Sequence, residues 1–415
     1  MLIDIFIVSV LLVLFERTIV GKDNFLPFSP LFIFLASYNL LFIFADVIAL
    51  FTNADLLYMS KLDHEYRYKY EIFNRVFFYF FVALFFLYFF SRKNKSRKAS
   101  ILQTIPFSWV VFVLLLGVVA KFLYLGAGLG FNPVSVLQRV IYPREFTYIK
   151  SGTGLINYLQ GALLLLSYFL SVVHYHQAKS KKAILLMVFC GFFFFIGGAK
   201  QQLLWLAFIF IMVKVKYTDI TASGLRKNLK YLIVLCGLVV LSFSIMVVRA
   251  DERSLFEKLV KYQRESYYSA LVLNDFKWDY EYPATAVVDT LLAPVPRFVW
   301  EEKPLLGFYN RYWRSVYESS TVSYHTSTYG FIAEAHMIFG AIAPIMYALL
   351  FFFLVRYCYE GILGKTTLLG IFSTIYLSTL FYFFLRSGVT GFTLINVLFT
   401  LLVCFLLAKR VFEIK

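Results

Sequence analysis

Apolar runs of about 20 residues recur along most of the chain, and most are long enough to cross the roughly 30 Å hydrocarbon core of a bilayer. Hydrophobic residues make up 60% of the 415 residues and charged residues only 15%. The mean hydropathy of +0.74 excludes an ordinary soluble domain. The sequence therefore predicts an all-α polytopic membrane protein, with residues 1–415 forming a single integral membrane domain.

The apolar runs predict about eleven transmembrane helices, of which the shorter ones would be tilted or completed by flanking residues. They cover residues 2–15, 26–52, 73–90, 101–125, 154–173, 183–198, 201–213, 231–248, 329–355, 366–385 and 392–408. The first run has no basic leading region and no small-residue cleavage site. We therefore expect a retained span and not a removed signal peptide.

Lysine and arginine orient this chain, because short loops rich in them stay on the cytoplasmic side. Together, six short segments carry 20 basic and 5 acidic residues, a net +15 of the total +16. These segments are 16–25, 91–100, 174–182, 214–230, 356–365 and 409–415. Placing them inside predicts an N-terminus outside and a cytoplasmic C-terminus. The excess of basic residues then reflects the orientation of the chain in the membrane, and it does not indicate nucleic-acid binding.

One long polar segment interrupts the apolar pattern at residues 249–328, between the eighth and ninth spans. The predicted orientation places this large outer loop in the periplasm or cell exterior. The spacing of apolar residues over 249–275 predicts an amphipathic helix on the membrane surface. Three prolines within 291–307 predict extended backbone there. An enzyme acting on a membrane-bound substrate needs such a surface, whereas a carrier seldom does.

Ionisable residues inside spans are costly and mark functional sites by default. Six of them fall near the outer ends of the predicted spans, and none was expected near the inner ends. They are Asp46, Lys121, Lys200, Glu334, His336 and Arg386. Three spans also begin at this side with small or capping residues, at 150–154, 197–202 and 326–330. Helix N-termini attract anions, so the outer side is predicted to hold phosphate.

The sequence gives no support for a disulfide framework or a metal site. Four cysteines, Cys190, Cys236, Cys358 and Cys404, fall in spans or at the cytoplasmic edge, so no disulfide framework is expected. The five histidines form no metal-ligand spacing with each other or with cysteine. We therefore expect neither a metal nor a cofactor.

Two short motifs carry a resemblance to a known family. P-R-x-x-x-x-x-K-P occupies residues 296–304, and G-x-x-x-E-x-x-x-x-x-G occupies residues 330–340. With the many spans and the late outer loop, the chain resembles the O-antigen and capsule repeat-unit polymerases of the Wzy family. The resemblance implies a GT-C-like membrane glycosyltransferase of the bacterial cytoplasmic (inner) membrane. Lys200 stands where such proteins often carry arginine, and a lysine cannot pair with phosphate through two parallel bonds.

The resemblance also implies undecaprenyl-diphosphate-linked oligosaccharides as substrates, with a chain-length regulator and a flippase as further partners. The departing diphosphate requires cations, and the attacking hydroxyl requires a general base. Arg297 is the foremost predicted cation, and Glu334 or His325 the predicted base. Weaker candidates for binding the diphosphate or the sugars are Arg249, Arg139, Lys200, Lys303, Trp300 and Tyr329.

Two alternatives stay open at the level of sequence. A lipid-linked oligosaccharide flippase or related carrier would explain the spans and the cations, but the halves of the chain show no repeat, which carriers commonly have. An O-antigen ligase, which moves finished polymer onto another acceptor, shares nearly every feature with a polymerase.

Overall fold

The structure is a computed structural model, and it describes part of the chain. The described ranges are 2–20, 29–39, 65–89, 104–129, 132–135, 154–196, 200–217, 330–388 and 392–412, with residues 273, 288, 291, 292, 295 and 300 of the large outer loop. All regular elements within these ranges are helices, which confirms the predicted all-α class.

The described helices overlap ten of the eleven predicted apolar runs. They are α1 (Leu2–Val20), α2 (Pro30–Tyr38), α5 (Glu65–Phe89), α6 (Phe107–Leu129), α8 (Gly154–Ala178), α9 (Lys181–Ile196), α10 (Lys200–Tyr217), α16 (Gly330–Phe339), the 3-10 turn η2 (Gly340–Ile342), α17 (Ala343–Gly364), α18 (Leu368–Thr379), α19 (Phe381–Ser387) and α20 (Phe392–Phe412). The predicted run at 231–248 lies outside the described residues.

Four helical stretches are long and apolar enough to cross a membrane, which supports a membrane-embedded protein. They are Phe107–Gly126, Ile156–Ala178, Gly330–Gly364 and Leu368–Arg386. Shorter apolar helices cover Ile7–Glu16, Phe78–Phe89, Trp205–Lys214 and Val397–Leu407. The count of about eleven spans stays a prediction.

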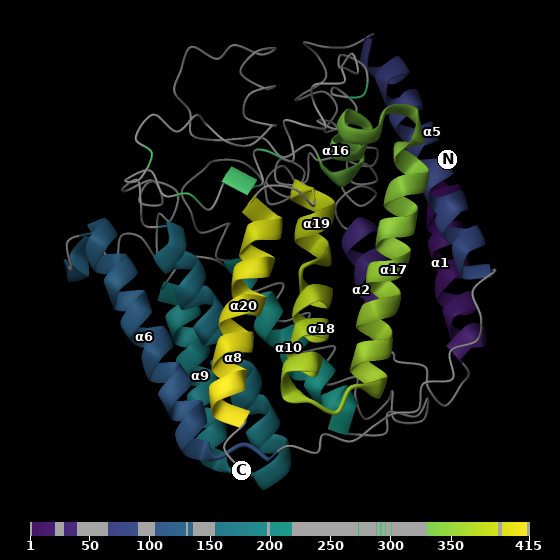
Figure 1. Ribbon diagram of the computed structural model, residues 1–415. Coiled ribbons are helices and arrows are strands. Elements are labelled where there is room, and N and C mark those ends of the chain that lie inside the picture. The colour runs from purple at the N-terminus through teal and green to yellow at the C-terminus, as the bar shows by residue number, and fades with distance from the viewer. Residues whose placement is uncertain are drawn as a thin grey trace.

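The helices pack into one bundle whose two sides meet at α18 and α10 (Figure 1). On one side α8 packs against α6, α9, α10 and α20, and on the other α17 packs against α5, α18 and α2. Glycines permit the closest approaches. A Cβ at Gly117 of α6 would lie 3.0 Å from Cδ2 of Leu164 in α8, and one at Gly361 of α17 would collide with Thr374 of α18. Small residues at helix contacts are typical of membrane bundles.

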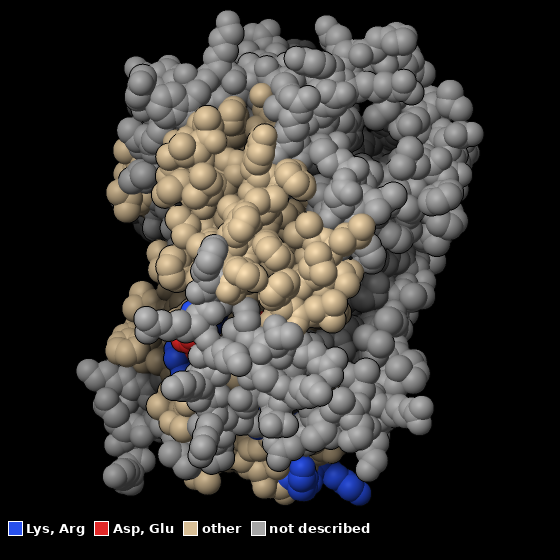
Figure 2. All heavy atoms as spheres, turned by 90° about the vertical axis from the view of Figure 1, so that its right-hand side faces the viewer, with Lys and Arg blue, Asp and Glu red and all other residues tan. Residues whose placement is uncertain are grey.

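The outward surface of α1, α5 and α17 is apolar. Large hydrophobic side chains stand exposed on all three helices, including Leu14, Phe86 and Phe353 with 51%, 51% and 63% of their surface accessible. In Figure 2 the described surface on this side is tan over most of its area, with charged side chains confined to one small cluster and the lower edge. A described surface with exposed large hydrophobic side chains and few charges is suited to contact with lipid.

Several of the predicted cytoplasmic segments meet at one end of the bundle, which we call the basic end (Figure 1). His176 of α8 stacks on Tyr217 of α10, with ring centroids 5.2 Å apart. Lys216 Nζ of α10 donates a hydrogen bond of 2.8 Å to the Leu363 carbonyl at the end of α17. The C-terminus lies at this end and the N-terminus at the other. We call the opposite end, where α8, α10 and α16 begin, the loop end.

One expectation about ionisable residues is wrong. None was expected near the inner ends of the spans, yet α1 extends to Val20 and buries Glu16, and α10 extends to Tyr217 and buries Lys216. Ser29 donates to the Glu16 carboxylate and also caps α2 by accepting a 3.0 Å bond from the Phe32 amide. Both helices extend beyond the predicted apolar runs because the polar side chains at their ends form hydrogen bonds inside the protein.

Candidate functional site

Helix α16 is separated from α17 by a sharp break. Gly330 opens α16 with φ 78°, and Gly340 follows it with φ 58°, conformations that other residues rarely adopt. The two are the glycines of the G-x-x-x-E-x-x-x-x-x-G segment. The span predicted over 329–355 lies within the apolar stretch Gly330–Gly364, but the left-handed Gly340 turns the chain inside it and divides it into two helices.

The break brings together residues that a straight helix would hold far apart. Tyr347 of α17 donates a 2.7 Å hydrogen bond to Oε2 of Glu334 in α16. Thirteen residues separate the two in the chain, and in one continuous helix that separation would span about 20 Å. The break therefore folds α16 back against α17, so that Tyr347 of α17 holds Glu334.

The Glu334 carboxylate is fully buried, with 0% of its surface accessible, and Gly330 beside it is buried as well. Helix α17 packs on α16 and supplies the Tyr347 hydroxyl to this carboxylate. A buried carboxylate needs such a partner, since an unpaired one costs several kcal/mol.

An aromatic cluster lies beneath the carboxylate and joins five helices. Phe331 stacks on Tyr347 with ring centroids 6.0 Å apart and meets Phe80 of α5 and Phe351 of α17 edge to face at 5.2 Å each. Phe34 of α2 contacts Phe351 at 4.8 Å and Phe381 of α19 at 6.0 Å. Edge-to-face packing of this kind favours one arrangement of the rings. The cluster therefore holds α16 on a rigid apolar base.

Helix α19 packs on the other flank of α16 and carries Arg386 in its last turn. Arg386 is half-buried, and α19 ends at Gly388 with φ 81°. Sequence reasoning placed Arg386 among the outer ionisable residues but did not include it in the site. It also missed Tyr347, because a tyrosine inside an apolar run gives no signal of a carboxylate partner thirteen residues earlier.

Most of the other predicted site residues lie outside the described residues, and their convergence on Glu334 stays a prediction. They are Arg297, His325, Arg249, Arg139, Lys303 and Tyr329. Lys200 is the first residue of α10, one residue before the predicted start of the seventh span, but nothing of its side chain is described. Trp300 is half-buried.

Lys121 lies on a different group of helices from Glu334. It is buried, with 2% of its surface accessible, in α6, which packs on α8 and α9. Helix α16 packs instead on α17 and α19. The two ionisable residues that sequence analysis grouped on one side of the membrane are thus set in separate parts of the bundle.

The start of the 291–307 segment differs from the expected extended backbone. Leu291 and Leu292 are helical, and the Val295 amide donates a 3.1 Å bond to the Leu292 carbonyl. Both leucines precede the first proline of the segment, Pro294, so no ring or missing amide interrupts the helix there.

Gly340→Ala is expected to lower the stability of the folded protein by about 1–2 kcal/mol, because alanine in the left-handed conformation places Cβ against the following carbonyl. Gly191→Ala is the matched control. A Cβ at Gly191, within α9, meets only Leu206 Cδ1 at 3.9 Å, so alanine there should stabilise by about 0.5–1 kcal/mol. Thermal unfolding midpoints of the two variants in detergent should shift in opposite directions. Equal shifts would show that the break at Gly340 is not required.

No group of three or more His, Cys, Asp or Glu side chains that could hold a metal ion occurs within the described ranges. Comparison with known proteins gives no match to a family model, to a curated protein or to a solved structure.

Proposed function

We propose that this protein is a membrane glycosyltransferase that joins oligosaccharide repeat units carried on undecaprenyl diphosphate into a longer polysaccharide. The observation that carries the proposal is the buried Glu334 on the short helix α16, which begins directly after the large outer loop. A carboxylate at the border between an apolar bundle and a polar loop suits a reaction between lipid-linked sugars.

In the proposed reaction, a hydroxyl of one repeat unit attacks the anomeric carbon of the growing chain. A new C–O glycosidic bond forms, and the bond between the anomeric carbon and the diphosphate oxygen breaks. Glu334 accepts the proton of the attacking hydroxyl, with His325 as the alternative base. Undecaprenyl diphosphate departs with two negative charges or more, which Arg297 is proposed to stabilise.

The buried position of Glu334 imposes a condition on this proposal. A base must come within hydrogen-bond reach of the proton that it accepts, about 2.6–3.2 Å between heavy atoms. Substrate binding must therefore move α16 away from Tyr347. Gly340 is the natural hinge for this movement, because a glycine tolerates a large change in φ and ψ.

The other proposed contacts bind the phosphate and the sugars. The residues proposed to contact phosphate are Arg249, Arg139, Lys200 and Lys303, and those proposed to contact sugar rings are Trp300 and Tyr329.

One observation supports the alternative function, a carrier of lipid-linked oligosaccharides. Glu16 and Lys216 are buried near the C-terminal ends of α1 and α10, while Glu334 is buried in α16 and Lys121 in the second half of α6. Buried ionisable groups at both ends of the described bundle are what a translocation pathway would contain. The two functions require different experiments to separate them.

Purified protein given only undecaprenyl-diphosphate repeat units, with a chelator present, should form a ladder of products and release undecaprenyl diphosphate. The chelator tests the expectation that no metal is required. A ladder without any second acceptor also excludes a ligase, which needs one. If no ladder forms, while vesicles containing the protein move the lipid-linked sugar across the bilayer, the carrier replaces the polymerase.

A further inference from the structure

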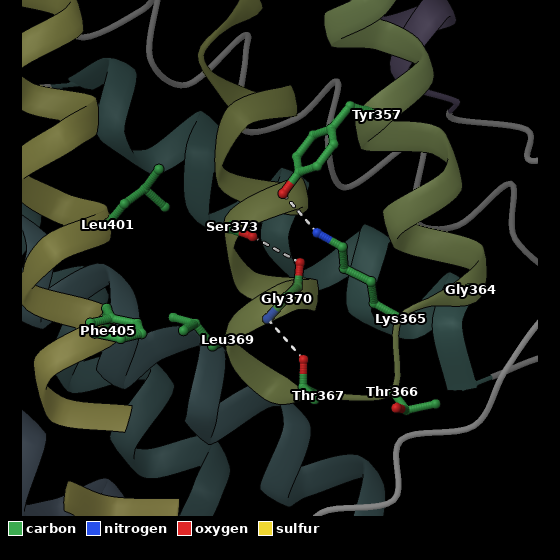
Figure 3. Close-up of a pocket in the computed structure, with 10 residues that line it drawn as sticks. All are labelled: Tyr357, Gly364, Lys365, Thr366, Thr367, Leu369, Gly370, Ser373, Leu401 and Phe405. Atoms are coloured by element: carbon green, nitrogen blue, oxygen red, sulfur yellow. Dashed lines mark hydrogen bonds between the residues drawn. The ribbon is translucent and has the colours of Figure 1, made fainter. Parts of the chain in front are cut away.

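A pocket of about 580 Å³ opens at the basic end between α17, α18 and α20, far along the chain from Glu334 (Figure 3). Its polar wall contains Tyr357, Lys365 and Thr367, and its apolar wall Leu369, Leu401 and Phe405. Helix α18 forms the floor, since it packs on both α17 and α20. Two chemically different walls thus face one space.

The polar wall carries a positive charge that no carboxylate neutralises among its recorded contacts. Lys365 caps the end of α17, and its Nζ donates a 2.7 Å hydrogen bond to the Tyr357 hydroxyl. The same Nζ lies 4.2 Å from the centroid of the Tyr357 ring. Both partners are neutral groups of one tyrosine, so the ammonium charge remains available to an anion.

The backbone next to Lys365 reinforces this charge. Thr367 caps α18, and its Oγ1 accepts a 3.3 Å bond from the Gly370 amide. Thr367 at the start of α18 lines the same pocket as Lys365, and Figure 3 shows it below the lysine ammonium, which points toward Tyr357. The positive end of the α18 dipole therefore adds to the positive potential of the pocket. A Cβ at Gly370 would lie 2.7 Å from Lys365 Cδ and 2.8 Å from Thr367 Oγ1, so the glycine permits the lysine stem to lie against this turn.

The apolar wall continues onto surface that faces outward. Phe405 is 52% exposed and Leu402, one turn before it on α20, is 53% exposed. A soluble anion would need only the polar wall. A molecule with a charged head and apolar chains would use both walls at once.

We propose that this pocket binds an anionic phospholipid, with its phosphate at Lys365 and the first turn of α18 and an acyl chain along Leu401 and Phe405. The site is separate from the proposed catalytic residues. Anionic lipids are enriched in cytoplasmic leaflets, where each basic residue adds about 1 kcal/mol of attraction. The lipid would fasten α17 to α20 at the end of the bundle opposite α16.

The first test uses purified full-length protein in neutral detergent, with the thermal unfolding midpoint followed during addition of lipid. Phosphatidylglycerol should raise the midpoint, whereas phosphatidylcholine with the same acyl chains and inorganic phosphate should not. Lys365→Gln should weaken the phosphatidylglycerol effect about fivefold. Lys182→Gln is the matched control, because it removes one exposed lysine from the start of α9 at the same end. Equal responses of the two variants, or of the two lipids, would overturn the proposal, and a response to phosphate alone would assign the pocket to a soluble anion.

A second measurement leaves the charge unchanged and does not depend on Lys365→Gln folding normally. A benzophenone side chain at position 405 should cross-link phosphatidylglycerol in preference to phosphatidylcholine when both are present in equal amounts. The same side chain at position 353, which is 63% exposed on α17, should cross-link both lipids alike. Equal yields of the two lipids at position 405 would remove the lipid from the pocket.

Discussion

Glu334→Gln should reduce the rate of chain elongation by about 10²-fold or more, because glutamine retains the size of glutamate but cannot accept the proton of the attacking hydroxyl. The amide oxygen can still accept the hydrogen bond that Tyr347 donates at 2.7 Å. The fold around α16 should therefore survive, and binding of the lipid-linked unit should change much less than turnover. The measurement is the initial rate of ladder formation by purified protein, with substrate binding determined separately.

Two controls separate a lost base from a disturbed structure. Tyr347→Phe removes the hydroxyl that holds Glu334 but retains the ring that stacks on Phe331, so it should destabilise the protein by about 1–3 kcal/mol and leave a base in place. Glu360→Gln removes a 41% exposed carboxylate that pairs with Arg356 on α17, and exposed pairs contribute about 0–1 kcal/mol. Full activity of Glu334→Gln would make His325 the leading base.

Arg297→Ala should abolish elongation while the amount of protein in the membrane stays unchanged. Removing one preorganised group that stabilises developing negative charge typically costs about 10²-fold or more in rate. Arg297→Lys should restore only part of the activity, because lysine keeps the charge but lacks the planar fork that binds two phosphate oxygens. The length distribution of the polymer in cells and the ladder formed by purified protein both measure this effect.

Arg356→Ala is a matched loss of arginine on α17, where the side chain is 37% exposed and bonded to Glu360. It should leave elongation close to normal, since it lies toward the basic end and outside the proposed site. If Arg297→Ala instead makes polymer of normal length, Arg297 does not contact the diphosphate, and Arg249 becomes the next residue to test.

The lipid pocket and the proposed catalytic site lie at opposite ends of α17. Glu334 is held by Tyr347 near the start of this helix, whereas Lys365 caps its end. A lipid at the basic end would therefore stabilise the helix that positions the carboxylate without touching the substrate. Loss of the lipid should lower the unfolding midpoint of Glu334→Gln as much as that of the unaltered protein.

Sequence alone determined the helical membrane class and several helix boundaries. The predicted starts of the fifth, seventh and ninth spans, at 154, 201 and 329, lie within one residue of the first residues of α8, α10 and α16, namely Gly154, Lys200 and Gly330. These features were predictable because hydropathy, length and turn-forming residues act over a few neighbouring positions. The placement of Cys190 and Cys404 in spans and of Cys358 at the cytoplasmic edge was equally local, and all three are free and buried.

The partners of the buried polar groups were decided only by the tertiary structure. Tyr347 holds Glu334, Ser29 holds Glu16, and the Leu363 carbonyl holds Lys216. In a soluble helix, the pattern of polar and apolar residues shows which face is buried. Helices of a membrane protein are apolar on the lipid side as well as on the protein side, so that pattern is nearly lost. The turn at Gly340 and the packing of α16 on α17 therefore became visible only when the helices were placed side by side.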